Sequence, residues 1–204
     1  MIFLITLILE NYNLTLCGRY SLNLENSISN FKKDTVTKFP KIFSFKNTDI
    51  SPSSKNPVIF FNNKEYLFEL FKWGLSYGWL SKGRVLFNLR SETVSDKNFS
   101  KDLIMKKRCL VPFNSYFEWQ NIPPLKKKFI LQTKENISYF AAVYKETSQG
   151  NEYSILTKAS EQNIKHIHDR SPVIVPKKLV KQWFSDNYFG ILDSLSVSIN
   201  YSEV

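Results

Sequence analysis

The chain has 204 residues, of which 43% are hydrophobic and 23% are charged. This length suits one sizeable hydrophobic core, and the balance of apolar and charged residues excludes a mainly disordered chain. The 28 lysines and arginines against 18 acidic residues give a formal net charge of +10, which favours a polyanionic partner such as nucleic acid.

Strand-length runs of apolar and aromatic residues predict a sheet, and they lie at residues 58–61, 66–74, 84–88, 108–113, 115–119, 128–132, 139–144 and 152–158. Helical spacing is predicted for residues 21–31, for 160–168 with a serine N-cap, and for 176–184 with proline at the first position. The fold class expected is therefore α+β, with a single domain built on a mostly antiparallel, barrel-like β sheet and peripheral helices.

The two cysteines, Cys17 and Cys109, are too few for the disulfide framework of a small secreted domain. A reducing compartment follows, and we expect a cytoplasmic, nucleoid-associated protein if the source is bacterial. Cys109 lies in an apolar run and is expected to be a buried core thiol. The apolar residues 1–10 have no preceding Lys or Arg and are too short to cross a bilayer as a helix, so we expect no membrane partner.

Chemically useful side chains concentrate in four stretches, namely CGRY at 17–20, NLRSET at 88–93, SYFEW at 115–119 and HIHDRSP at 166–172. Glu118 lies between two aromatic residues in a segment that alternates like a strand. Pointing inward, its carboxyl group would be desolvated and suited to general acid–base catalysis. Pointing outward, it would be an ordinary solvated carboxylate, and the local sequence leaves both possibilities open.

His168 and His166 are the two histidines of the chain. Without a further Cys/His pair at the spacing of a metal site, we expect no metal and no cofactor. A proton-shuttling histidine and a packed histidine both remain open for His168. Arg19, Arg90 and Arg170 carry guanidinium groups that suit phosphate oxygens, although each alone also fits a surface ion pair.

Taken together and in order, five motifs resemble the SRAP family, the SOS response-associated peptidase or abasic-site processing proteins. The motifs are CGRY, WGL with a following Trp79, NLRSET, KRCLVPFNSYFEW and HIHDRSPVIV. The resemblance spans residues 17 to about 185. Two departures, Phe113 with Ser115 and Asp49 with Ser51, stand where the family has smaller residues and an Asn/Ala pair, so loop geometry or DNA contacts are expected to differ.

The resemblance implies binding of single-stranded DNA and a covalent crosslink to abasic sites through an amino-terminal cysteine, here Cys17. Its α-amine, with a pKa of about 8, would attack the C1′ aldehyde to form a Schiff base, and its thiol would close a thiazolidine ring. The site residues implied are Cys17, Glu118, His168 and Asn88 for the chemistry, and Arg19, Arg90, Trp73 and Arg170 for DNA. Glu118 would move protons, His168 would assist sugar ring opening and crosslink reversal, and Asn88 with Arg90 would hold the sugar and its flanking phosphate.

Residues 1–16 conflict with this chemistry, because an amide at Cys17 replaces the free amine. Translation starting at position 16, where a UUG codon for Leu16 would be read as Met, is the expected explanation, and the SRAP-like domain would then be 17–204. Removal of the extension by the family's self-processing peptidase activity is a second explanation. Retention of the extension in a DNA binder without crosslinking is a third.

Two other function classes remain. A noncatalytic single-stranded nucleic-acid-binding module would use Lys and Arg for phosphates and aromatic residues for stacking. A thiol peptidase acting in trans would use Cys17 activated by His168 and oriented by Glu118. In the crosslinking hypothesis the protein is expected to act as a monomer on single-stranded DNA that contains abasic sites.

Overall fold

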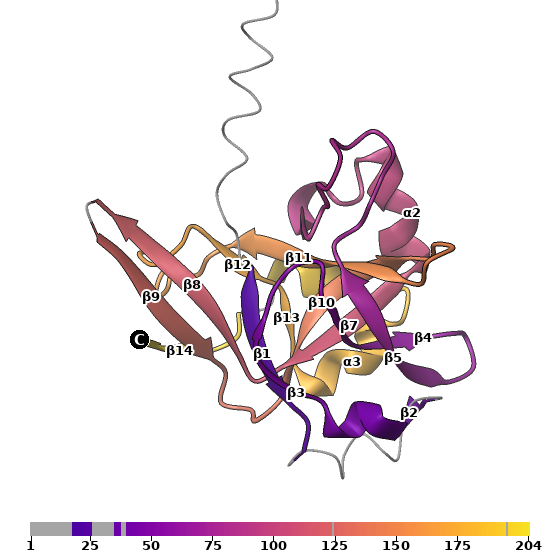
Figure 1. Ribbon diagram of the computed structural model, residues 1–204, viewed down its shortest axis with the longest axis horizontal. Coiled ribbons are helices and arrows are strands. Elements are labelled where there is room, and N and C mark those ends of the chain that lie inside the picture. The colour runs from indigo at the N-terminus through magenta and orange to yellow at the C-terminus, as the bar shows by residue number, and fades with distance from the viewer. Residues whose placement is uncertain (1–17, 26–34, 38–39, 124, 195) are drawn as a thin grey trace, which may run out of the picture.

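A computed structural model describes residues 18–25, 35–37, 40–123, 125–194 and 196–204 (Figure 1). Its strands are β1 (Arg19–Asn23), β2 (Thr35–Val36), β3 (Lys46–Ile50), β4 (Lys55–Phe61), β5 (Tyr66–Trp73), β6 (Asn88–Arg90), β7 (Arg108–Phe113), β8 (Ser115–Ile122), β9 (Leu125–Gln132), β10 (Ser138–Lys145), β11 (Glu152–Ala159), β12 (Arg170–Pro172), β13 (Ile174–Val175) and β14 (Asn200–Glu203). The α-helices are α2 (Asn98–Lys106), α3 (Val180–Trp183) and α4 (Phe189–Ser194), and the 3-10 helices are η2 (Pro40–Ser44), η3 (Ser91–Thr93) and η4 (Lys177–Leu179).

Five strands close into a barrel in the order β11-β10-β7-β4-β5, because β5 pairs back onto β11 with Trp73 opposite Tyr153. This closing pair is parallel, and the other four pairs of the circuit are antiparallel. Strand β10 is buried along nearly its whole length; it lies between β7 and β11 in the barrel, and α2 contacts it. The barrel-like, mostly antiparallel sheet with peripheral helices confirms the predicted fold class.

A second sheet has the strand order β14-β9-β8-β1-β3. Only Asn114 separates β7 from β8, so one stretch of chain runs from the barrel directly into this sheet. The β8–β9 hairpin and β14 extend away from the barrel as an arm (Figure 1). Strand β1 pairs with β8 and also contacts β7, and the described chain therefore begins where the two sheets meet.

Aromatic side chains fill the barrel. Trp73 has no exposed surface, stacks on Tyr153 with ring centres 6.1 Å apart, and donates its indole N–H to the Phe87 carbonyl at 2.8 Å. Phe113 stacks on Phe140 at 3.8 Å. Because a side chain without exposed surface cannot contact DNA, the prediction of Trp73 as a DNA-binding residue is wrong, and its role is in the core.

Two predicted helices are wrong where the structure describes them. The first was predicted over 21–31, but residues 21–23 form the end of β1, because Tyr20, Leu22 and Leu24 are buried at every second position and the strand pairs with β8 and β3. Residues 26–31 of this predicted helix lie outside the described residues. Residues 160–168 form successive turns that bury Ile164 and Ile167. Helical structure over 176–184 is confirmed as η4 followed by α3.

The predicted strands are confirmed with one exception. Residues 84–88 make only an isolated bridge, Leu86 to Leu75, before β6 begins at Asn88. Helix α2 was not predicted. Within the part of the chain that the structure describes, no helix has the length and apolar character needed to cross a membrane.

Candidate active site

Glu118 is buried on β8, with 2% of its surface exposed. It lines a narrow hollow that has no room for a water molecule, together with His168, Arg170 and Tyr116. The hollow lies where β8 faces the turns that precede β12. Of the two orientations that the sequence left open, Glu118 takes the inward one, and a carboxyl group and an imidazole from distant motifs meet at one place.

His168 is held by the backbone that follows it. Its Nδ1 lies 3.1 Å from the peptide nitrogen of Arg170 and 3.1 Å from the Arg170 carbonyl oxygen, so it accepts from the first or donates to the second according to the ring tautomer. The Asp169 carboxylate lies 3.2 Å from the same Nδ1 and can pair with the ring when it is doubly protonated. These contacts hold the imidazole in orientation from its Nδ1 side.

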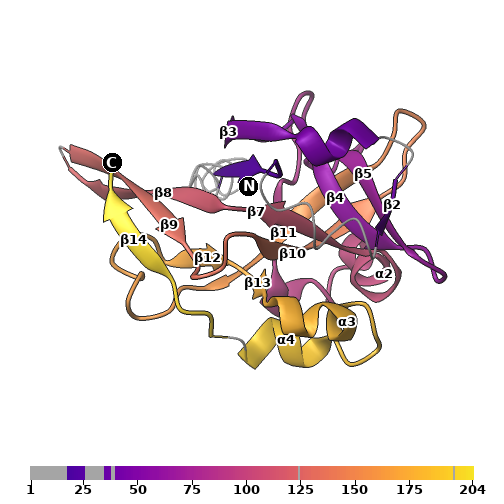
Figure 2. The ribbon, with the colours of Figure 1, turned by 90° about the horizontal axis from the view of Figure 1, so that it is seen from below.

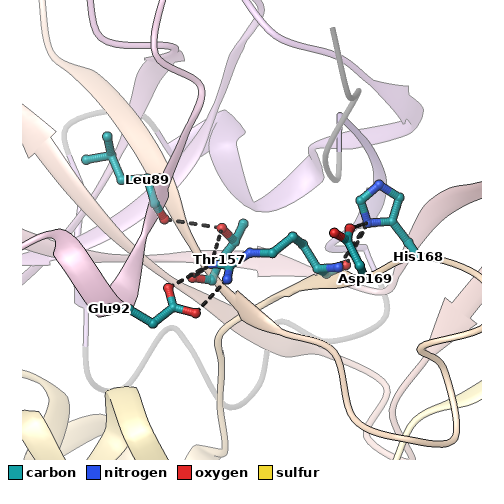
Figure 3. Close-up of polar contacts among 6 residues, drawn as sticks. Leu89, Glu92, Thr157, His168 and Asp169 are labelled. Carbon is teal, nitrogen blue, oxygen red and sulfur yellow. Dashed lines mark hydrogen bonds and ion pairs between the residues drawn. The ribbon is translucent and has the colours of Figure 1, made fainter. Parts of the chain in front are cut away.

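Arg170 joins two of the motifs, and Figure 3 shows its partners Glu92 and Thr157. Its guanidinium donates to both carboxylate oxygens of Glu92, at 2.5 and 2.8 Å, and to the Thr157 carbonyl at 2.7 Å. The side chain of Arg170 is 13% exposed, and its guanidinium donates hydrogen bonds to groups of the protein. This bridge holds η3, which follows NLR, against β12, which begins at the arginine of the HDR motif. Contact of Arg170 with DNA stays a prediction.

Glu92 was not identified from the sequence, although it lies within NLRSET. Partial burial raises the pKa of Glu92, but the hydrogen bonds and charge of Arg170, with backbone N–H groups, outweigh this effect and lower the pKa below its ordinary value. The carboxylate is therefore ionised over the whole neutral range. The only available signal was the position of an acidic residue in the first turn of a short helix.

Asn88 and Arg90 lie on β6, which pairs in parallel with β11 and places Arg90 opposite Thr157. Alternation along the strand directs these two side chains to one face and buried Leu89 to the other. Arg90 is exposed and forms no ion pair with any residue in the described ranges. Because β12 pairs with the opposite edge of β11, NLR and HDR lie about 10 Å apart, two strand spacings.

Arg19 begins β1 and forms an ion pair with Asp49 on β3. In the pairing of β1 with β8, Arg19 is opposite Phe117, so Gly18 comes level with Glu118 as the chain is followed backwards. Cys17, the predicted nucleophile, lies outside the described residues. The structure thus brings together the motifs around Glu118, His168 and Asn88, and it directs the start of β1 toward them.

Cys109 and Trp79, which both lie in or next to the motifs, differ in exposure. Cys109 is fully buried and burial raises the pKa of its thiol well above the ordinary value, which confirms a core cysteine. Trp79, which follows the WGL motif, is 61% exposed and stacks on Tyr77 with ring centres 5.4 Å apart. Among the described residues no group of three or more His, Cys, Asp or Glu could hold a metal ion.

Solved structures share this fold. A protein from Bacteroides thetaiotaomicron has a TM-score of 0.77 with 20% identity and 92% coverage of both chains. A protein from Bordetella bronchiseptica has a TM-score of 0.72 with 15% identity, covering 92% of this chain and 99% of its own. The likeness to these structures is one of fold, a class of mostly antiparallel β-barrel proteins, and in this chain that fold places a buried carboxyl group and a histidine beside β1.

The family model of the SOS response associated peptidase (SRAP) matches residues 16–195, and the chain belongs to this family. The abasic site processing protein YoqW of Bacillus subtilis is 27% identical over 183 residues, which are 83% of this chain and 80% of YoqW. The abasic site processing protein YedK of Escherichia coli is 28% identical over 123 residues, 58% of this chain and 55% of YedK.

Proposed function

We propose that this protein processes abasic sites in single-stranded DNA by forming a covalent crosslink through Cys17. Membership of the SRAP family, relatives named abasic site processing proteins and a net charge of +10 support this function. The observation that carries it is the placement of buried Glu118 and His168 in one hollow beside the strand that begins two residues after Cys17.

The reaction begins with the neutral α-amine of Cys17, whose ordinary pKa of about 8 leaves a reactive fraction at neutral pH. The amine adds to the C1′ aldehyde of the ring-opened sugar, and a carbon–nitrogen bond forms as the carbonyl oxygen becomes a hydroxyl. Loss of that hydroxyl as water gives the Schiff base. The thiol then adds to the imine carbon and closes the thiazolidine, so the adduct equals protein plus DNA less one water.

The buried carboxyl group of Glu118 is suited to donate the proton that the departing hydroxyl needs and to accept one at ring closure. Nε2 of His168 exchanges a proton with the sugar during ring opening and during reversal. Asn88 and Arg90, which share one face of β6, hold the sugar and the flanking phosphate, and Arg19 contacts the backbone of the strand. No metal or cofactor is needed for any of these steps.

A free α-amine requires that residues 1–16 be absent from the working protein, and the working domain is then 17–204. The family model begins its match at residue 16, which supports this proposal. We further propose that the protein acts as a monomer in the compartment that holds the DNA, the cytoplasm of a bacterium.

The decisive experiment compares a protein whose mature sequence starts at Cys17 with one that retains residues 1–16. Each is incubated with single-stranded DNA carrying one abasic site and analysed by intact mass after denaturation. The shorter protein should give the dehydrated adduct and the longer one none. Cys17→Ser keeps the amine without the thiol, so it should give only a Schiff base that borohydride traps.

Different outcomes identify the other function classes. Salt-sensitive binding by the shorter protein without any adduct would indicate a noncatalytic nucleic-acid-binding module. Cleavage of added peptides without an adduct would indicate a thiol peptidase. Within the crosslinking reaction, Glu118→Gln should slow adduct formation at saturating DNA by about 10²- to 10⁴-fold, the usual contribution of general acid–base catalysis.

A further inference from the structure

An open groove lies at the end of β1 that is far from Glu118, between β1 and β3. It has a volume of about 310 Å³. Its polar lining consists mainly of asparagines, with one lysine, one threonine and one serine whose hydroxyl is bonded to Ser115: Asn23, Asn47, Asn114, Asn136, Lys46, Thr48 and Ser21. A groove with four amides is chemically distinct from the carboxylate and imidazole of the candidate active site.

Hydrogen bonds within the groove settle the orientation of its amide groups. The Oδ1 atom of Asn23 accepts the peptide N–H of Glu25 at 3.0 Å, and Oδ1 of Asn47 accepts that of Asp49 at 2.9 Å. With both oxygens engaged by backbone donors, the NH₂ groups of these two asparagines are left to face a ligand.

Asn114 forms the wall of the groove. Its Oδ1 accepts the peptide N–H of Asn23 at 2.5 Å, and its Nδ2 donates to the Asn136 carbonyl at 2.7 Å. Both ends of the Asn114 amide are therefore used within the protein. This side chain fixes the turn between β7 and β8 against β1 and keeps the shape of the groove.

Lys46 and Thr48 add to the donors. Both are exposed, and the ion pair of Lys46 with Glu25 is long, at 3.9 Å between two side chains that are each more than half exposed. Such a pair contributes little and is easily exchanged for another anion. Two amide NH₂ groups, an ammonium group and a hydroxyl thus offer donors and positive charge to a ligand that has acceptors and negative charge.

A phosphodiester group has only acceptor oxygens and one negative charge, whereas a nucleobase edge generally presents donors as well. We propose that the groove binds a phosphodiester of the same DNA strand that carries the abasic site, a few nucleotides from the reacting sugar. This inference rests on the proposed function. It assigns to the strand a path along β1, from the candidate active site to the groove.

The length of β1 sets the distance that the DNA strand must span between the candidate active site and the groove. From Gly18 to Asn23 the chain advances about 17 Å, at about 3.3 Å per residue. A trinucleotide with a central abasic site is too short to occupy both places, while a longer strand can fill them together. The groove should therefore affect the affinity for long strands and leave the crosslinking of a trinucleotide unchanged.

The test uses the double variant Asn23→Asp and Asn47→Asp. Each aspartate keeps an oxygen for the backbone N–H that it now accepts, so the turns are retained, while the NH₂ donor is replaced by negative charge. Fluorescence anisotropy measures affinity for a 15-nucleotide intact single strand, and adduct formation is timed with the abasic trinucleotide. We expect at least tenfold weaker binding of the long strand and an unchanged rate with the trinucleotide.

Two further variants separate the groove from a general charge effect. Asn187→Asp makes the same change next to α3 and α4, on the side of the molecule opposite β3 (Figure 2), and should change affinity less than twofold. Thr48→Val removes one donor without adding charge and should weaken binding two- to fivefold. In the double variant, loss of the phosphate contact in the groove should also reduce the slope of log affinity against log salt concentration by about 0.7.

Equal affinities of the double variant and Asn187→Asp would overturn the proposal, as would a long-strand affinity of the double variant equal to that of the unmodified protein. Thermal unfolding of each variant verifies that the fold is retained. Because affinity is measured on an intact strand, the groove is tested even if no adduct forms. Failure of the crosslinking reaction and failure of the groove are therefore distinguishable.

Discussion

The bridge between Arg170 and Glu92 predicts a specific loss of stability. Arg170→Met keeps most of the aliphatic stem and removes the guanidinium, with its two bonds to Glu92 and its bond to the Thr157 carbonyl. A hydrogen bond to a charged group contributes about 1.5–3 kcal/mol. The Glu92 end is 45% exposed, so solvent screening reduces its share, and we expect a total loss of about 2–3 kcal/mol.

For a chain of this length, each kcal/mol lowers the midpoint of thermal unfolding by about 2–4 °C. Arg170→Met should therefore lower that midpoint by about 4–12 °C at pH 7, measured by circular dichroism or calorimetry. Glu92→Gln retains one acceptor oxygen and should cost about half as much free energy. A midpoint within 1 °C of the unmodified protein would refute the assignment of Arg170 as a stabilising bridge.

The pH dependence of this bridge has a defined sign. In the folded protein the pKa of Glu92 lies below its ordinary value of 4.5, so the unfolded chain takes up a proton at higher pH than the folded chain does. The stabilisation is complete above the ordinary pKa and is lost as pH falls through the folded one. The difference in stability between the unmodified protein and Glu92→Gln should shrink from pH 7 to pH 3, and a constant difference would contradict this explanation.

Three other substitutions and one labelling experiment test particular parts of the structure. Gly74→Ala should lower the free energy of unfolding by about 2–4 kcal/mol, because Gly74 has φ +120° and an added Cβ would lie 2.8 Å from Cβ of Val85. Gly83→Ala serves as its control: Gly83 has φ +80° but lies in open space, so the loss should be only about 1–2 kcal/mol. Trp73→Phe should lower stability by about 1–3 kcal/mol without changing affinity for single-stranded DNA in an anisotropy assay. Cys109 should resist iodoacetamide in the folded protein and react only after denaturation, since burial raises the pKa of its thiol and covers it; mass spectrometry would detect early labelling as a contradiction.

The sequence predicted most strands because aromatic and β-branched runs mark buried β structure wherever they end in turn residues. Barrel closure was predicted only as a general shape, since the parallel pairing of β5 with β11 joins residues about eighty positions apart and leaves no local signal. Helix α2 was missed because its ends lack the usual signs: Lys97 makes no side-chain cap at the start, and Lys107 rather than glycine follows the end.

The candidate site shows a similar division between local and long-range information. Alternation could not decide which face of β8 is buried, so the burial of Glu118 had to come from the packing of Tyr116 against Phe113 and Phe140. Trp73 was assigned to DNA binding because the sequence around an aromatic residue does not show whether its ring stacks on a base or, as here, on Tyr153 in the core. The bridge from Arg170 to Glu92 spans 78 positions, and only the fold brings its partners together.

The register of β8 determines whether the proposed chemistry is possible. Tyr116 is fixed in the core, and the pairing of Tyr116 with Leu131 continues along the whole hairpin with β9. A slip of one residue would turn every side chain of β8 to the other face and put Glu118 into solvent. Because β7 continues into β8 through one residue, the closed barrel itself holds this register. The strand that begins at Arg19 pairs with the same β8, so the barrel sets both the position of the carboxyl group and the direction from which the amino-terminal nucleophile would approach it.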